Sequence, residues 1–388
     1  MNNYPKIIIS GGGTGGHIFP AVAIANALKS ISPNCEILFV GAEGRMEMEK
    51  VPAAGYKIVG LNIAGIQRGS ILKNLGLPFK VVSSVRKAMK LISDFKPDAV
   101  VGVGGFASGP LLYAAKLKGI PYLIQEQNSY AGITNKLLGK GAAKICVAFD
   151  GMEAFFPADK ILKTGNPVRN NIVDIKGKHH AGAELLKLNP LKKTILVTGG
   201  SLGAGTLNKS IEKHLSDFIA QDVQVIWQTG KFYYRGVLER VGLDYHPNVI
   251  ILEFLNKMDL AYAAADLIIS RAGAGTIAEL CIIQKPVILV PSPNVAEDHQ
   301  TKNAMALVKN DAAILINDRS AEDTLVAEAL KLLQNADRCE VLSENIGKMA
   351  YQDSDIVIAN EVLKLVSKSH IKVLPKGENL GGAENGIK

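Results

Sequence analysis

"KIIISGGGTGGHIFPAVAIANALKS", residues 6–30, places a short apolar run, a glycine-rich turn and an apolar helical segment in direct succession. Fully apolar runs of this length are typical of strands in a parallel sheet that is covered on both faces. The pattern starts again at residues 192–215, "KKTILVTGGSLGAGTLNKSIEKHL", after a polar linker at 162–182. The repeat predicts an α/β protein with two doubly wound, Rossmann-like domains that face each other across a cleft.

The expected domain boundaries follow from this linker and from the length of the chain. A chain of 388 residues is longer than one hydrophobic core usually organises. We predict an N-terminal domain over 1–165, a C-terminal domain over 166–354, a helix at about 355–370 that packs back on the first domain, and a disordered tail over 374–388. Ligands of such sheets bind beyond the carboxyl ends of the strands, so the cleft would bring two substrates together.

Positive charge is concentrated in the first half of the chain. Residues 1–165 contain 19 Lys and Arg against 10 Asp and Glu, whereas residues 166–388 contain 25 against 26. This asymmetry is expected if the first half faces a polyanion or an anionic membrane. A solvated basic surface explains it equally well.

The remaining composition favours an ordinary globular protein of a reducing compartment. The four cysteines are scattered and form no CxxC pair, so neither a disulfide framework nor a zinc site is indicated. The first residues lack the features of a signal peptide. Residues 99–115 are uncharged but contain four glycines and a proline, and we expect a strand, a turn and a helix there rather than a membrane span.

Four glycine-rich turns follow strands of the predicted sheets, at residues 11–16, 102–105, 199–205 and 273–275. Such turns present backbone N–H groups and a helix N-terminus, which favours anions. A single turn equally indicates close packing of helix on sheet, but four predict phosphate on both sides of the cleft. The first turn also satisfies GxGxxG, with Glu43 where a ribose-binding acid could be, so a dinucleotide-binding oxidoreductase is a distant alternative. His17 and the recurrence of the turns argue against it.

Polar side chains follow several of these strands. Glu126 and Asn128 end the segment "LIQEQN", where a carboxylate beside amides could bind sugar hydroxyls or remove a proton, or could instead belong to a helix cap. Arg169 could clamp a diphosphate from the linker, or simply be solvated. Glu279 could accept both hydroxyls of a ribose, although an acid near a helix N-terminus is favourable in any case. No DxD motif stands at a strand end where a nucleotide diphosphate would bring a metal.

Together these residues resemble the lipid I N-acetylglucosaminyltransferases of glycosyltransferase family 28. The matching segments occur in the family's order over residues 6 to about 365 and read "GGTGGHIFPA", "GVGGFASGP", "EQN", "GNPVR", "GGSLGA" and "RAGAGTIAE". The resemblance implies a GT-B fold and an inverting, metal-independent reaction without a cofactor. In that reaction N-acetylglucosamine (GlcNAc) moves from UDP-GlcNAc to the 4-hydroxyl of N-acetylmuramic acid (MurNAc) in the diphosphate-linked lipid I, giving lipid II.

The resemblance also implies the binding residues. The C-terminal domain would hold UDP-GlcNAc, with Ser201 at the diphosphate, Leu255 at the uracil and Glu279 at the ribose. The rest of the implied donor site is Thr14, Gly15, Gly16, Asn128, Arg169, Ala274, Gly275, Thr276 and Gln300. The acceptor diphosphate would lie against Gly12, Gly13, Gly104 and Gly105. The family often has a bulkier residue in place of Gly275.

His17 and Glu126 are the two candidates for the general base at the MurNAc hydroxyl, and His17 could instead be a partner of the diphosphate. An uncharged histidine suits this role, and the sequence does not decide between them. Another GT-B enzyme, such as a UDP-GlcNAc 2-epimerase or a glycolipid synthase, would share the nucleotide site but not the acceptor. The partners implied are UDP-GlcNAc, the undecaprenyl-linked acceptor and proteins of cell-wall synthesis, without nucleic acid.

The lipid acceptor implies a peripheral protein on the cytoplasmic face of the bacterial inner membrane. Between Ile63 and Lys96 there are seven basic residues against one acid, Asp94. The interleaved apolar residues are Ile71, Leu72, Leu75, Leu77 and Phe79. Apolar side chains among lysines predict a shallow contact with anionic lipid. The alternative is that these apolar residues belong to the core.

Overall fold

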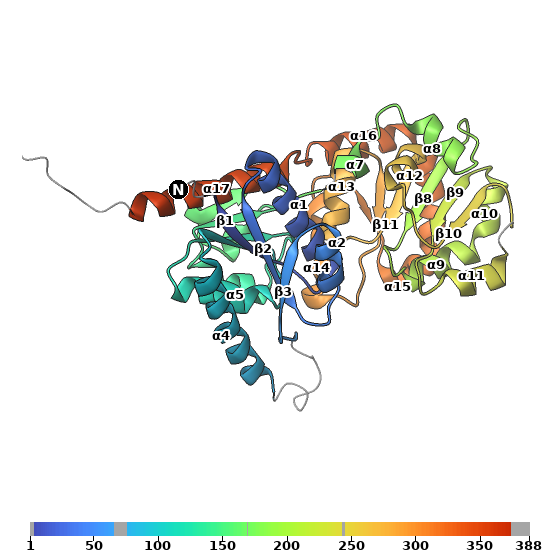
Figure 1. Cartoon of the computed structure of the whole chain (residues 1–388). Helices are drawn as coiled ribbons and strands as arrows, with labels where there is room; N and C mark the ends of the chain where they lie inside the picture. Colours follow the sequence, from blue (N-terminus) through green and yellow to red (C-terminus); the bar gives the residue numbers. More distant parts are fainter. Residues whose placement is uncertain (1–3, 66–75, 169, 243–244, 374–388) are drawn as a thin grey trace, which may run out of the picture.

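The computed structural model describes residues 4–65, 76–168, 170–242 and 245–373, and it contains two parallel sheets side by side (Figure 1). The N-terminal sheet has the order β3-β2-β1-β4-β5-β6-β7. Its strands are β1 (Lys6–Ser10), β2 (Glu36–Ala42), β3 (Lys57–Leu61), β4 (Ala99–Gly102), β5 (Tyr122–Glu126), β6 (Lys144–Val147) and β7 (Ile161–Lys163). All pairings described are parallel, as the apolar runs predict.

Helices cover both faces of this sheet because alternate strand residues point to opposite sides. Ile7 and Ile9 belong to one core cluster, whereas Ile8 between them belongs to the other. The first cluster packs under α1 (Gly15–Ile31) and α2 (Glu47–Ala53). The second packs under α4 (Leu77–Phe95), α5 (Ser108–Leu117) and α6 (Ile133–Gly139).

The C-terminal sheet repeats the architecture in the order β10-β9-β8-β11-β12-β13. Its strands are β8 (Thr194–Thr198), β9 (Gln224–Gln228), β10 (Val249–Leu252), β11 (Leu267–Ser270), β12 (Val287–Leu289) and β13 (Ile314–Leu315). Its helices are α7 (Asn170–Val173), α8 (His179–Leu185), α9 (Gly205–Lys213), α10 (Leu215–Ala220), α11 (Tyr234–Val241), α12 (Met258–Ala264), α13 (Ala274–Ile283), α14 (His299–Val308), α15 (Asp318–Leu333) and α16 (Ala336–Gly347).

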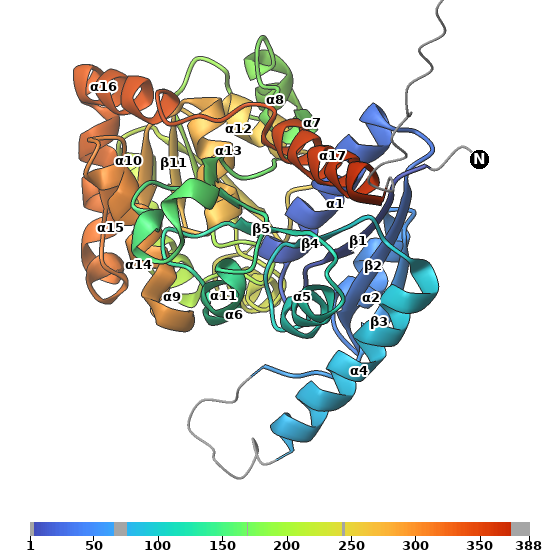
Figure 2. The ribbon, with the colours of Figure 1, turned by 90° about the vertical axis from the view of Figure 1, so that its left-hand side faces the viewer.

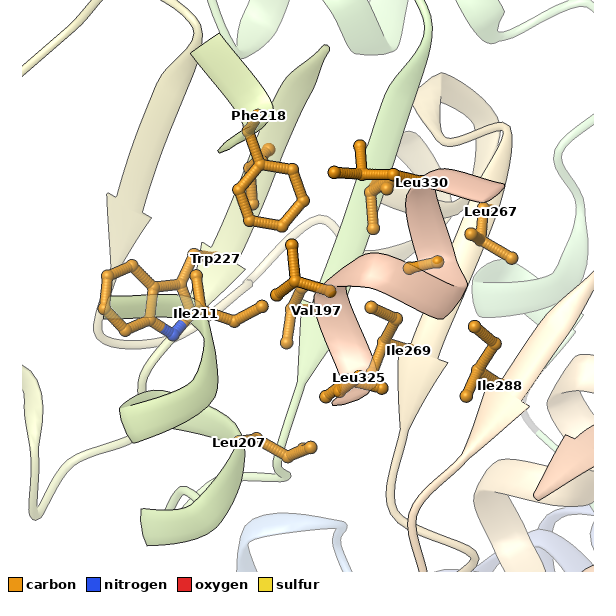
Figure 3. Packing of buried hydrophobic residues seen from close by; sticks show 14 of the residues in the cluster. Val197, Leu207, Ile211, Phe218, Trp227, Leu267, Ile269, Ile288, Leu325 and Leu330 are labelled. Atoms are coloured by element: carbon orange, nitrogen blue, oxygen red, sulfur yellow. The ribbon is translucent and has the colours of Figure 1, made fainter. Parts of the chain in front are cut away.

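The core of this second domain shows the same division between the two faces. Val197 and Ile269 of the central strands contact Ile211 of α9 and Leu325 of α15 on one face (Figure 3). Leu196 and its neighbours on the other face pack under α12, α13 and α14. Both expected Rossmann-like domains are therefore present, and the predicted fold class is confirmed.

The chain returns to the first domain after the second is complete. Helix α17 (Ser354–Val373) lies along α1 in both views (Figures 1 and 2) and buries Ile358, Ala359 and Val362 in the N-terminal core. The two segments that connect the domains touch at Gly165, where an added Cβ would lie 2.3 Å from Cβ of Tyr351. The segment expected as a linker at 162–182 contains α7 and the start of α8, and the expected tail at 374–388 lies outside the described residues.

Candidate active site

The first glycine-rich loop connects β1 to α1 at the carboxyl end of the N-terminal sheet. It packs backbone to backbone on the loop that follows β4. A Cβ on Gly105 would lie 2.3 Å from the carbonyl oxygen of Gly12, and Gly105 has a φ of +82°. Close approach of two main chains therefore requires glycine here, whether or not a phosphate binds. The contacts of Gly12, Gly13, Gly104 and Gly105 with an acceptor diphosphate remain a prediction.

A buried carboxylate supports this loop from beneath, and sequence reasoning missed it. Glu47, the first residue of α2, is fully buried. Its Oε2 accepts the N–H of Gly13 at 3.0 Å, and its Oε1 accepts the N–H of Ala42 at 3.0 Å. The N–H of Gly13 thus points to Glu47 in this structure. In the segment "RMEMEK" this glutamate looks like any charge of a solvated helix, so no local pattern distinguishes it.

His17 lies in the first turn of α1, with its ring against the second glycine loop. A Cβ on Gly104, which has a φ of +100°, would lie 2.6 Å from Cδ2 and 2.9 Å from Nε2 of His17. Only a glycine leaves room for the imidazole ring there. The Nδ1 of His17 is 3.2 Å from Oγ1 of the exposed Thr14.

The surroundings keep His17 uncharged at neutral pH. Burial is the largest effect and lowers the pKa of His17 to about 4. A hydrogen bond with the backbone of Gly12 opposes this shift, His299 across the cleft reinforces it, and Glu47 opposes it. A neutral imidazole that lines the cleft can accept a proton from a hydroxyl group.

Glu126, the other candidate base, is buried at the end of β5 and is surrounded by hydrogen-bond donors. Its Oε1 accepts from the N–H of Asn128 at 3.1 Å and from Nδ2 of Asn128 at 3.4 Å. Its Oε2 accepts from the N–H of Gly132 at 3.0 Å and from Nδ2 of Asn135 at 2.8 Å. Burial raises the pKa of Glu126, and these hydrogen bonds oppose the shift. Both oxygens therefore hold the loop between β5 and α6 in place.

A cleft of about 1590 Å³ joins these residues. His17, Gly104, Glu126 and Asn128 line it from the N-terminal domain, and His299 lines it from the C-terminal domain. Apolar side chains of the helices that cover the N-terminal sheet also line it, namely Val81, Val82 and Val85 of α4, Tyr113 of α5 and Leu137 of α6. The structure thus brings both candidate bases to the same cleft.

The glycine loop after β8 is the counterpart of the first glycine loop in the C-terminal domain, at the carboxyl end of its sheet. A Cβ on Gly230 would lie 2.1 Å from the backbone nitrogen of Gly203, so these two loops also meet main chain to main chain. Ser201 is exposed on the loop, and an added Cβ at Gly200 would have no atom within 4 Å. This loop is open to a ligand at residues 200 and 201 and closely packed at Gly203.

Helix α13 begins after β11 and carries the glutamate predicted to hold a ribose. The half-buried Glu279 accepts the O–H of the buried Tyr262 at 3.0 Å, which orients its carboxylate. Gly275, in the first turn, has open space where a side chain would stand. A bulkier residue would fit at this position.

Two further residues of the implied donor site have structural contacts of their own. Leu255 is buried in a core cluster, so a ligand would meet its backbone rather than its side chain. Gln300, in the first turn of α14, accepts the N–H of Ser292 at 2.8 Å through Oε1. Its side-chain amide nitrogen carries the remaining donor capacity. Thr14, Gly15 and Gly16 lie at the start of α1, and Arg169 lies outside the described residues.

The side chain of Asn166 bridges the "EQN" segment of the N-terminal domain and the start of α13 in the C-terminal domain. Nδ2 of the buried Asn166 donates to the carbonyl oxygen of Gln127 at 3.0 Å and to that of Ala274 at 3.4 Å. Arg271, in the loop between β11 and α13, is held by Asp318 at 2.5 Å and by two carbonyl oxygens at the end of β12. Its charge is therefore used in support of the loop.

A metal site needs several ligating side chains close together. Within the described ranges, no group of three or more His, Cys, Asp and Glu side chains is arranged to hold a metal ion. A DxD triplet occurs at Asp353–Asp355, but it lies where the chain enters α17. Among the residues that the structure describes, no helix is long and apolar enough to cross a membrane.

Two Rossmann-like domains, each with glycine-rich loops at the carboxyl end of its sheet, define an enzyme of the GT-B class. Models of glycosyltransferase family 28 match both halves, the N-terminal domain model over residues 7–147 and the C-terminal domain model over residues 194–358. The chain belongs to glycosyltransferase family 28.

Its relatives match over nearly their whole length. A Parabacteroides distasonis protein named UDP-N-acetylglucosamine–N-acetylmuramyl-(pentapeptide) pyrophosphoryl-undecaprenol N-acetylglucosamine transferase is 56% identical, covering 95% of this chain and 100% of the relative. A Phocaeicola vulgatus protein of the same name is 57% identical, covering 95% of this chain and 98% of the relative.

Solved structures agree with the fold. The crystal structure of Acinetobacter baumannii MurG superposes with a TM-score of 0.76 at 28% identity, covering 93% of this chain and 100% of that one. A UDP-N-acetylglucosamine 2-epimerase from Listeria monocytogenes, described as putative, reaches a TM-score of 0.66 at 15% identity, covering 98% and 100%. That second likeness concerns the fold alone.

Proposed function

We propose that this protein transfers GlcNAc from UDP-GlcNAc to the 4-hydroxyl of MurNAc in lipid I, which gives lipid II for peptidoglycan synthesis. The observation that carries the proposal is the identity of 56–57%, over nearly the full length, to transferases named for these substrates. The cleft supports it, because the neutral His17 lines it from the N-terminal domain and His299 lines it from the C-terminal domain.

In this reaction His17 is the general base. Its ring nitrogen takes the proton of the MurNAc 4-hydroxyl while that oxygen bonds to C1 of GlcNAc and the bond from C1 to the UDP oxygen breaks. Glu126 holds the neighbouring loop instead, because its oxygens already accept four hydrogen bonds. The backbone N–H groups at the start of α9 and α13 stabilise the departing diphosphate.

The direct test supplies radiolabelled UDP-GlcNAc with and without lipid I, each in the absence and presence of EDTA. Label should pass to the lipid fraction only when lipid I is present, and chelator should leave the rate unchanged. Conversion of UDP-GlcNAc to its 2-epimer without lipid I would identify an epimerase instead. Binding of NAD with no binding of UDP would overturn the assignment altogether.

Glu279 provides a prediction for the donor half. Glu279→Ala should weaken UDP binding by about 1–3 kcal/mol, because ribose hydroxyls would lose a charged acceptor. Isothermal titration of the full chain with UDP measures the change. Tyr262→Phe is the companion variant, since it removes the hydrogen bond that orients the carboxylate and keeps the aromatic ring. Unchanged UDP affinity in Glu279→Ala would leave this residue as a favourable charge near a helix N-terminus.

We further propose that the protein docks on the anionic cytoplasmic surface of the membrane through α4, α5 and α6, the helices that line the cleft with apolar side chains. Helix α4 projects from the N-terminal domain in both views (Figures 1 and 2). It buries Ser84, Ala88 and Ile92 on one side, while Phe79 is 80% and Val82 50% exposed. On α6, Leu137 and Ile133 are also exposed. A groove that leads from His17 to such a surface would guide a lipid-linked acceptor.

The charges around this apolar surface fit an anionic partner. Exposed Lys80, Arg86 and Lys90 lie on α4, and Lys116 follows on α5. Leu77 instead packs partly against the N-terminal core, so the expectation of an interfacial role does not suit its side chain. Ile71, Leu72 and Leu75 lie outside the described residues.

A flotation assay checks this docking. The double variant Phe79→Ser/Val82→Ser should lose binding to phosphatidylglycerol vesicles, because both side chains are exposed and would enter the interface. Salt should release the wild type, since cationic side chains attract the lipid. Leu191→Ser/Phe232→Ser is the matched control, with two exposed apolar residues of the other domain. Equal flotation of both double variants would place the contact elsewhere.

A further inference from the structure

Asn303 on α14 is fully buried where the two domains meet, and its side chain bonds to both of them. Its Oδ1 accepts the N–H and the O–H of Ser129, each at 2.9 Å. Its Nδ2 donates to Oδ1 of Asn128 at 3.1 Å and to the carbonyl oxygen of Ala272 at 3.5 Å. A carboxamide has two donor hydrogens and two acceptor lone pairs, and all four are used here.

These hydrogen bonds connect the loop that follows β5 with the loop that follows β11, through few side chains. Asn128 bonds back to Glu126 at the end of β5, and Ala272 lies between β11 and the start of α13. Gln300 stands one turn earlier on the same helix as Asn303. A displacement of α14 would therefore also shift residues of the implied donor site in both domains.

Asn303 also determines which way the amide of Asn128 points. Asn303 donates to Oδ1 of Asn128, while Glu126 accepts from its Nδ2. The two contacts exclude the flipped orientation, in which a donor would face a donor. They leave Asn128 one lone pair and one hydrogen for a ligand in the cleft.

We propose that Asn303 is a positioning residue: it fixes Asn128 in the orientation that recognises the transferred sugar, and it holds the two domains at the spacing this requires. The inference rests on the proposed function, in which Asn128 helps to bind GlcNAc. UDP itself would contact the C-terminal domain, where Asn303 makes its longest hydrogen bond, at 3.5 Å to the carbonyl oxygen of Ala272, so UDP affinity would depend little on Asn303. The sugar would depend on it, because part of the sugar site comes from the other domain.

Aspartate at position 303 separates the role of the acceptor oxygen of Asn303 from the role of its donor nitrogen. Asn303→Asp keeps the acceptor facing Ser129 but loses both donor hydrogens, so that its second carboxylate oxygen would face Oδ1 of Asn128 and the carbonyl oxygen of Ala272. Asn310→Asp is the matched control, an identical change at an exposed position just beyond the end of α14. We expect Asn303→Asp to raise KM for UDP-GlcNAc at least tenfold, with UDP affinity within twofold of the wild type. The control should change neither.

A double-mutant cycle distinguishes positioning from general support of the interface. Asn128→Ala and Asn303→Ala should each weaken UDP-GlcNAc binding, and the double variant should be no weaker than the worse single variant. If the fold-losses of UDP-GlcNAc affinity in the two single variants multiply in the double variant, Asn303 does not act through Asn128. That result would overturn the proposal. Equal losses of UDP and UDP-GlcNAc affinity would overturn it as well.

The same measurements separate this proposal from the proposed function. Titrations with UDP and UDP-GlcNAc need no acceptor, so they test Asn303 even if the wild type fails to glycosylate lipid I. If the Asn303 variants do not fold, Ser129→Ala replaces them in the cycle with Asn128→Ala, since it removes one hydrogen bond to Asn303 Oδ1. The proposal then requires that Ser129→Ala and Asn128→Ala have non-additive effects on the free energy of UDP-GlcNAc binding. Additive effects of the two variants would overturn it.

Discussion

Replacing His17 by alanine is expected to lower kcat by about 10²–10⁴-fold, the usual contribution of a general base. The affinity for UDP should stay within twofold, because the ring lies on the N-terminal side of the cleft. Kinetics with lipid I and a UDP titration measure the two quantities. The expectation rests on a neutral ring held against Gly104 in the wall of the cleft.

The pH profile gives an independent check on the same residue. A base must be unprotonated, so activity should be retained at neutral pH and lost as the pH falls through the pKa of His17, about 4. An unperturbed histidine would instead lose activity near pH 6.5. We therefore expect the acidic limb of kcat/KM well below pH 6, provided that circular dichroism shows an intact fold there.

His180→Ala serves as the control for His17→Ala, since it removes an exposed histidine of the other domain. Added imidazole should restore part of the turnover of His17→Ala, because the cavity left by the side chain opens on the cleft. Near-normal turnover of His17→Ala would show that another group takes the proton. The assignment of the base would then be wrong.

Glu126→Ala is expected to destabilise the protein as well as inactivate it. Four donors would lose their acceptor, two of them backbone N–H groups. A buried polar group left without a partner costs about 1–3 kcal/mol, and part of this loop can reach water through the cleft. We expect the free energy of unfolding to fall by about 3 kcal/mol in total.

Thermal unfolding and hydrogen exchange measure this effect. Exchange should increase first in the loop at residues 127–135, because its amides are those that bond to the carboxylate. Glu153→Ala, which removes an exposed acid of the same domain, should leave both measurements unchanged. A Glu126→Ala protein with normal stability but a turnover reduced about 10²–10⁴-fold would instead favour Glu126 as the base.

The architecture could be predicted from the sequence because its signals are local. Apolar runs such as residues 6–10, each followed by glycines and a helical segment, specify buried parallel strands within some 25 residues of chain. Because ligands lie at the carboxyl ends of such strands, the sequence also indicates the glycine loops and "EQN" as parts of a site. His17, Gly104, Glu126 and Asn128 do line one cleft.

What those residues do there was decided by tertiary contacts. Glu47 and Gly13 are 34 residues apart, and Ser129 and Asn303 are 174 apart, so no sequence window contains either pair. The sequence does not distinguish Glu126 from His17 as a base, and it does not show that donors from Asn128, Gly132 and Asn135 surround the oxygens of Glu126. The number of hydrogen-bond donors and acceptors of a side chain is fixed by its residue type, which can be read from the sequence. Which partner uses that capacity depends on packing between elements that are distant in the chain, and only the folded structure brings those elements together.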